Sequence, residues 1–181
     1  MKRNILAALL ALTLLLGLVL PVAAEEVQDA PSDVETIRIA SAEEFLTFAK
    51  NCVLDSWSQN KQVLLTADIS LEGTDFAPIP TFGGTFLGDG HTISGLRIDA
   101  SGSRMGLVRY IQKGAVVRDL HVSGTVTPDG SRTFVGGIAG VNAGAIQGCS
   151  FRGIVKGDEA VGGIVGRNDE TGEIAGCTAS G

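Results

Sequence analysis

Charged and titratable side chains alternate with apolar ones in several short segments, and four of them are candidates for a ligand-binding face: Arg97, Asp99, His121 and Arg152. Successive residues of a strand point to opposite faces of a sheet, so these four are expected on one outer face. Polysaccharide lyases and hydrolases built on β-helices use such a face, but they need clustered carboxylates beside a basic group. Asp99 is the only carboxylate of the set. We therefore expect a binding face or an ordinary solvated face, and no catalytic residue.

A metal centre has few potential ligands in this chain, which contains two histidines. His91 follows a Gly-Asp-Gly turn that the side chain of Asp89 is expected to stabilise, so we assign this histidine to the turn. The sequence contains no Ser-His-Asp set, phosphate-binding glycine loop or Cys-x-x-Cys pair. We expect neither a bound metal ion nor a cofactor.

The elements that must position these side chains repeat along the chain. The pattern Ile93, Leu96, Ile98 returns at 117–122, 146–151 and 174–179, in steps of 24, 29 and 28 residues. Repeats of this period are typical of solenoids, whose units bury their apolar faces against each other. Two buried columns are predicted: Ile93, Val117, Ile146 and Ile174 in the first, and Leu96, Leu120, Cys149 and Cys177 in the second. The same alignment predicts two outer columns: Arg97, His121, Ser150 and Thr178, and beside them Asp99, Ser123, Arg152 and Ser180.

Residues 63–181 combine short strand patterns with glycine corners, which favours an all-β fold, a right-handed parallel β-helix. An up-and-down β-sandwich would not copy positions in this way, and leucine-rich repeats need a leucine frame that these copies lack. The last copy ends at Gly181 without the capping segment that terminal repeats normally need. We therefore expect the chain to be truncated at its C-terminal end.

One amphipathic helix is predicted ahead of the repeats, after a short strand, within residues 37–62. Ser41 and Glu44 have the spacing of a capping box. The apolar residues follow the i, i+3, i+4, i+7, i+8 template of a helix, and they are Phe45, Phe48, Ala49, Cys52 and Val53. We expect this α-helical cap to cover the first turn of the solenoid, whose open strand edges would otherwise recruit other chains.

The N-terminus has the features of a signal peptide. Lys2 and Arg3 precede an apolar run from Ile5 to Leu20, and small residues allow cleavage after Ala24. A membrane anchor is the alternative, although the run is short for a bilayer. We expect an exported protein, extracellular or on the cell surface, with no membrane attachment after cleavage.

Residues 25–36 are predicted to form an acidic, flexible leader. Removing residues 1–24 changes the net charge from −6 to −8, because that segment holds two of the 14 basic residues and none of the 20 acidic ones. An acidic exported chain lacks the electrostatic footprint for nucleic acid or anionic lipid. We therefore expect neither as a partner.

The ladder cysteines have two interpretations. Equivalent positions in neighbouring strands lie about 4.8 Å apart, which permits a Cys149–Cys177 disulfide. Their parallel Cβ vectors disfavour its geometry and favour two thiols that act as small core hydrophobes.

Two further sets of residues, a pair of asparagines and a group of phenylalanines, each have two interpretations. Asn142 and Asn168 are equivalent, and they form a stacked amide ladder or occupy left-handed corners. Three aromatic residues pack under the helix or form a sugar-stacking platform, and these are Phe76, Phe82 and Phe86.

Several segments resemble the GLUG-motif proteins. They are the segment Gly83–Leu96, the Val-Gly-Gly-Ile-x-Gly-x-Asn runs at 135–142 and 161–168, and the Gly-x-Ile-x-x-Cys-x-x-x-Gly closures. Proteins of this family are exported bacterial repeats, also found in front of the catalytic region of immunoglobulin-A-cleaving zinc metallopeptidases. The resemblance implies a right-handed β-helix on an exported or cell-surface protein. The zinc signature His-Glu-x-x-His is absent, so no catalytic residue is carried over.

We therefore predict an exported, non-catalytic β-helix module that acts as a cell-surface scaffold or adhesin, with a host or cell-wall glycan or protein as its partner. One alternative is the N-terminal accessory region of a larger secreted peptidase. The other is a carbohydrate-active β-helix enzyme, a lyase or a hydrolase.

Overall fold

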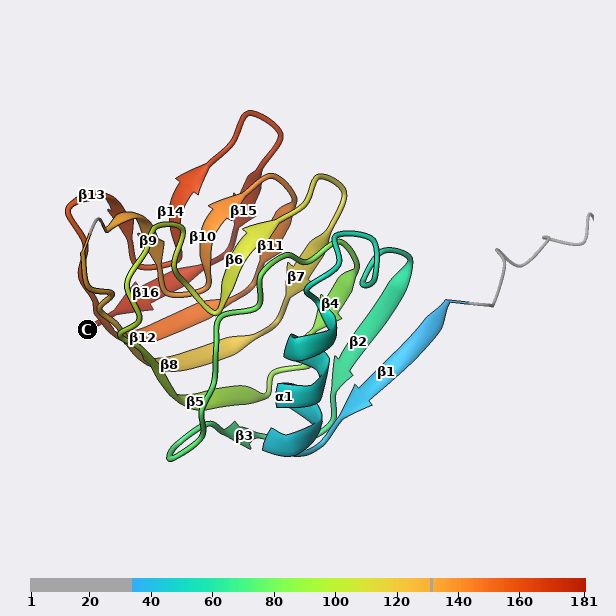
Figure 1. Ribbon diagram of the computed structural model, residues 1–181. Helices are drawn as coiled ribbons and strands as arrows, with labels where there is room; N and C mark the ends of the chain where they lie inside the picture. The colour runs from blue at the N-terminus through green and yellow to red at the C-terminus, as the bar shows by residue number, and fades with distance from the viewer. Residues whose placement is uncertain (1–33, 131) are drawn as a thin grey trace, which may run out of the picture. The chain divides into compact units, whose positions relative to one another are not determined.

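The structure is a computed structural model that describes residues 34–130 and 132–181. The predicted signal peptide and most of the predicted leader lie outside the described residues. From Val34 onward the chain forms a parallel β-solenoid of about five turns with one short helix, α1 (Ala42–Asn51), near its start (Figure 1). The predicted parallel β-helix with one N-terminal helix is confirmed.

Each full turn contributes strands to stacked sheets. Sheet A has six strands in the spatial order β1 (Glu35–Ile39), β2 (Lys61–Leu65), β4 (Thr85–Leu87), β7 (Val116–Arg118), β11 (Ala145–Gln147) and β15 (Glu173–Ala175). Sheet B has five strands in the order β16 (Thr178–Ser180), β12 (Ser150–Val155), β8 (His121–Val126), β5 (Thr92–Ile98) and β3 (Ile69–Ser70). Sheet C contains β14 (Val165–Asn168), β10 (Ala139–Asn142) and β6 (Val108–Ile111), and sheet D contains β13 (Glu159–Gly162) and β9 (Thr133–Gly136). All pairings between these strands are parallel.

Glycine is required where two strands of sheet B approach most closely. Gly124 and Gly153 are paired and have φ angles of 150° and 146°. A Cβ atom on Gly153 would lie 1.9 Å from the carbonyl oxygen of Gly124, and one on Gly181 would lie 1.9 Å from that of Gly153. The closing glycines of the sequence pattern therefore allow successive turns to stack in contact.

Helix α1 starts as its sequence predicts. The backbone N–H of Glu44 donates to the Ser41 hydroxyl at 3.3 Å, and Glu44 Oε2 accepts from the Ala40 N–H at 2.7 Å. The helix ends at Asn51. The chain therefore leaves the helical path before Val53. This residue is 65% exposed, so its predicted place on the buried face is wrong.

The buried face of α1 packs on aromatic side chains of the first turns. The ring of Phe45 stacks on that of Phe76 at 5.7 Å, and the ring of Phe48 lies 6.1 Å from Phe82 and 5.9 Å from Phe86. Phe82 and Phe86 are buried. They form the core under the helix, so the sugar-platform interpretation is wrong.

Strand β1 begins at Glu35, inside the segment predicted as leader. Glu35 pairs with Lys61 at the start of β2, both through the strand register and through an ion pair between their side chains. This pairing extends the first strand by two residues beyond the predicted boundary at 37.

Three members of the first predicted column stack as expected. Val117, Ile146 and Ile174 are direct neighbours in β7, β11 and β15. The predicted burial is wrong for Ile174, which is 43% exposed because β15 is the last strand of sheet A. Ile93 is not a neighbour of these three residues, because it pairs with Val122 of β8. Its predicted place beside Val117 is taken by Phe86.

Leu96 was predicted to begin the second column, and this is also wrong. The register of β5 against β8 shifts between Ile93 and Leu96, which places Leu96 against Gly124. Gly95 lies in this shift with a φ of 68°. The same three-residue spacing thus has two structural origins. In the copy that begins at Val117, it spans the corner at Asp119 between β7 and β8.

The later members of the second column are free thiols in the structure. Cys149 and Cys177 lie at equivalent positions, directly before β12 and β16. Cys149 is 1% exposed, whereas Cys177 is half-buried. Their sulfur atoms contact backbone carbonyls, Cys149 that of Gln147 at 3.3 Å and Cys177 that of Ala175 at 3.4 Å.

The two equivalent asparagines form the amide ladder. Asn142 Nδ2 donates to Asn168 Oδ1 at 2.8 Å, and Asn142 Oδ1 accepts from the Gly144 N–H at 3.1 Å. Neither asparagine has a positive φ, so the left-handed corner interpretation is wrong. Asn142 is fully buried, and its amide supplies the hydrogen bonds that this corner needs.

Candidate functional site

The outer face of sheet B carries the predicted ligand-binding residues that the structure brings together. His121, Ser150 and Thr178 are neighbours in β8, β12 and β16, and Ser123, Arg152 and Ser180 form the adjacent column. We call these six residues the sheet B face. His121 and Arg152 therefore lie close together, as the sequence predicts.

Arg97 and Asp99 do not stand in these two columns, although the exposed Arg97 lies on the same outer side of sheet B. Arg97 pairs with Thr125 and not with His121, whose neighbour in β5 is Thr92. Asp99 follows the end of β5, and its Oδ2 accepts a hydrogen bond from Arg97 Nε at 2.9 Å. The shifted register of β5 moves both residues away from their predicted columns.

The closest contact on the sheet B face joins a histidine and a serine. His121 Nδ1 lies 2.7 Å from the Ser150 hydroxyl. A serine nucleophile needs a base that a third group orients, together with donors for the oxyanion. In the described part of the chain, no hydrogen bond or ion pair joins a carboxylate to His121. The described residues therefore show a histidine–serine hydrogen bond without an orienting carboxylate.

Asp68 is a polar residue of this region that the sequence patterns did not reveal. Its Oδ1 accepts from the Thr92 N–H at 2.9 Å and lies 3.2 Å from His91 Nδ1. The backbone hydrogen bond and then the contact with His91 lower the pKa of Asp68 below its usual value. An aspartate one residue before a two-residue strand gives no repeat signal, so the contact is found only in three dimensions.

The turn before His91 closes through its backbone. The His91 N–H donates to the Gly88 carbonyl at 2.8 Å, and Asp89 adopts a φ of 51°. The side chain that contacts His91 is that of Asp68 and not that of Asp89. Within residues 34–130 and 132–181, no group of three or more acidic, histidine or cysteine side chains is arranged to hold a metal ion.

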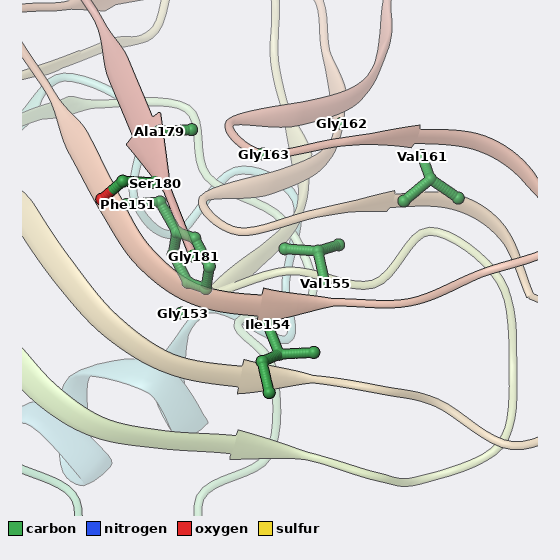
Figure 2. A pocket seen from close by; sticks show the side chains of 10 residues that line it. All are labelled: Phe151, Gly153, Ile154, Val155, Val161, Gly162, Gly163, Ala179, Ser180 and Gly181. Atoms are coloured by element: carbon green, nitrogen blue, oxygen red, sulfur yellow. The ribbon is translucent and has the colours of Figure 1, made fainter.

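A groove of about 390 Å³ opens in the last turn (Figure 2). It is lined by Phe151, Gly153, Ile154, Val155, Val161, Gly162, Gly163, Ala179, Ser180 and Gly181. None of these side chains is ionisable. The groove therefore presents apolar surface, backbone groups and the hydroxyl of Ser180.

Comparison with known proteins supports the resemblance inferred from the sequence. The model of the GLUG motif matches residues 157–181. Halomucin from Haloquadratum walsbyi (strain DSM 16790 / HBSQ001) is 35% identical over 121 residues, which span 58% of this chain and 1% of halomucin. The chain thus carries a GLUG motif in its last turns, and it corresponds to a very small part of this long relative.

A solved structure is also similar. It is the crystal structure of a candidate immunoglobulin A1 protease from Bacteroides ovatus, which is 17% identical. The match covers 81% of this chain and 68% of that chain, with a TM-score of 0.41. In the described residues of the present chain, no helix is long and apolar enough to cross a membrane.

Proposed function

We propose that this chain is an exported, non-catalytic GLUG repeat module that serves as a cell-surface scaffold or adhesin. The observation that carries the proposal is the sheet B face, in which three successive turns align hydroxyl, imidazole and guanidinium groups in two columns. Neighbouring strands are about 4.8 Å apart. The face is therefore a regular polar array, suited to hydrogen bonds with a glycan or with another protein surface.

The chemistry of the sheet B face supports binding rather than turnover. Glycoside hydrolysis generally uses two positioned carboxylates, and none of the six residues of the face is acidic. The nearby Asp99 is already paired with Arg97. Arg152 is exposed and forms no ion pair in the described part of the chain, so its guanidinium is free to bind a partner.

A small polar face binds weakly as a single copy. Linking many copies on a surface raises the effective concentration, and avidity then exceeds the affinity of one site by about 10²–10⁴. The first 24 residues predict export, and many copies held on one cell surface would supply that multivalent display.

The proposed binding is tested with many copies of the protein displayed on one surface. Beads coated with the purified protein are applied to glycan arrays and to arrays of cell-wall fragments, and Arg152→Ala is compared with Arg97→Ala. Both variants lose one exposed arginine from the outer side of sheet B, but only Arg152 is one of the six stacked residues of the sheet B face. We expect at least a fivefold loss of retention for Arg152→Ala and little change for Arg97→Ala.

Two results would reject the proposal. Equal losses for both arginine variants would mean that charge alone, and not the sheet B face, causes retention. Polysaccharide cleavage that Asp99→Asn abolishes would show an enzyme. N-terminal sequencing of protein recovered outside the cells tests export, with Glu25 as the expected first residue.

A further inference from the structure

Among residues 34–130 and 132–181, the first strand of sheet A has one unpaired edge. β1 pairs there with β2 alone, and the Ile39 carbonyl accepts a hydrogen bond from the Thr66 N–H on that side at 2.9 Å. In a parallel ladder, alternate residues direct their N–H and C=O groups to opposite sides of the strand. The peptide groups of Thr36 and Arg38 therefore point to the open edge.

A groove runs beside this edge, between β1 and α1, with a volume of about 580 Å³. Its apolar lining comes from Ile37, Phe48 and Trp57. The helix contributes Glu43, Thr47 and Asn51, which are four residues apart and therefore lie on one stripe of α1. A strand edge, an apolar floor and a helix wall thus lie next to one another.

The groove is acidic at its rim. Three carboxylates line it, those of Glu35, Glu43 and Glu44, beside one arginine, Arg38. Lys61 pairs with Glu35 and lies over the Trp57 ring, so the excess negative charge comes from the two helix carboxylates. Residues 25–33, which precede β1 in the sequence, contain four acidic residues and no basic one. Like charges oppose occupation by that segment, whereas a segment with basic side chains is attracted.

We propose that β1 and α1 form a docking groove for an extended, basic peptide segment of another protein. The segment adds a strand to sheet A beside β1, as in β-strand addition. Its backbone bonds to the free groups of Thr36 and Arg38. One apolar side chain enters the groove against Phe48 and Trp57, and a basic side chain two residues along, on the same face of the added strand, meets Glu43. This site is separate from the sheet B face and adds a second, peptide-binding function to the proposed role.

Three synthetic peptides test the groove by fluorescence polarisation with the purified protein. The first is an octapeptide in which lysine and valine alternate along one face of the strand, with threonine at the positions between them, and the second has glutamate in place of lysine. The third repeats the first with methyl groups on alternate backbone nitrogens, which removes the N–H donors of one edge. We expect saturable binding of the first peptide and at least tenfold weaker binding of the other two.

Two substitutions at one position locate the binding site. The Arg38 N–H faces away from β2, so Arg38→Pro leaves the β1–β2 hydrogen bonds intact while it removes the free donor. Arg38→Ala is the matched control, since it removes the same charge and keeps the donor. We expect Arg38→Pro to bind the lysine–valine peptide at least tenfold more weakly than Arg38→Ala, with both variants melting at similar temperatures.

The proposal fails if the lysine–valine peptide does not bind at millimolar concentration, or if backbone methylation has no effect on its binding. Equal affinity of the two Arg38 variants would place the peptide elsewhere. Loss of peptide binding in Arg152→Ala would move it to the sheet B face. Loss of glycan retention alone in Arg152→Ala would affect the proposed adhesive role and leave the groove untouched.

Discussion

The two ends of the solenoid bury their apolar side chains to very different extents. At the N-terminal end, α1 covers the core, and Phe45 and Phe48 are 0% and 2% exposed. At the C-terminal end, within residues 157–181, Val161 and Ile174 are 44% and 43% exposed. The stacked residues of one column illustrate the difference, since Ile146 is fully buried and its next neighbour, Ile174, is not.

This difference shows that a ladder residue is buried by the turns on both sides of it and not by its own sequence pattern. Close packing requires partner atoms in every direction. Ile174 has the previous turn on one side only, whereas Ile146 lies between β7 and β15. Equivalent substitutions at the two ends should therefore differ in their effect on stability.

The first prediction compares one substitution at two positions of the same column. Val117→Asp places a charge in the core and should lower the free energy of unfolding by about 3–5 kcal/mol. Ile174→Asp leaves the carboxylate in contact with water and should cost less than about 1 kcal/mol. Urea denaturation measures both. Similar losses at the two positions would mean that Ile174 is buried in solution.

The second prediction concerns the cap. Phe48→Ala removes a side chain packed against Phe82 and Phe86 and should cost about 3–4 kcal/mol. Val53→Ala is the control, because Val53 is 65% exposed. Thermal and urea unfolding compare the two variants.

Removal of the whole cap tests its protective role. Deletion of residues 37–55 exposes the aromatic core and the edge of β2, so we expect the protein to associate in analytical ultracentrifugation. A deletion variant that stays monomeric and equally stable would show that α1 is not a cap.

The third prediction tests the amide ladder. Asn142→Ala leaves the N–H of Gly144 without its partner inside the core and should cost about 2–3 kcal/mol. Asn168→Ala, in the exposed next turn, should cost about 1 kcal/mol. Chemical denaturation of the two variants measures the difference. Equal and small losses would indicate that water replaces the ladder at both positions.

The fourth prediction is the mildest, because it changes no residue. Burial raises the pKa of Cys52 to about 12 and that of Cys149 to about 11. A raised pKa keeps both thiols protonated at pH 8, where only the thiolate reacts. Cys177 is half-buried at the open end, so it should be the one thiol that reacts rapidly with Ellman's reagent in the folded protein.

The same reagent settles the redox state of the ladder. The fully unfolded protein should show three reactive thiols, in agreement with three free cysteines in the structure. A count of one would mean that Cys149 and Cys177 are joined, and it would fix the last two turns covalently.

The sequence alone predicted the architecture because the repeat is strict where the structure is regular. From Val117 onward, each copy has a strand, a left-handed corner and a second strand, with corners at Asp119, Gly148 and Gly176. The closing glycines stack because no Cβ fits between the turns. Cap spacing and apolar periodicity likewise predicted α1, since helix start signals are local.

The first copy shows where sequence reasoning stops. Ile93 and Leu96 have the same spacing as Val117 and Leu120, yet the first pair lies on either side of a shifted register within β5, and the second spans a corner. Apolar spacing reports which side chains avoid water, and both arrangements satisfy it. Only strand pairing distinguishes them, because register depends on residues of the neighbouring turn.

The candidate binding surfaces were likewise predicted in part from the sequence and in part found only in the structure. The strand alternation of residues 121–123 and 150–152 was enough to predict that His121 and Arg152 share an outer face. Only the tertiary structure showed that Arg97 and Asp99 are shifted out of the columns of that face, that Asp68 contacts His91, and that α1 lies beside the edge of β1. The sequence determines which residues can stack on one another in successive turns, because each turn repeats the same local pattern. Contacts between different turns, and between the cap and its edge strand, depend on distances that no local pattern contains.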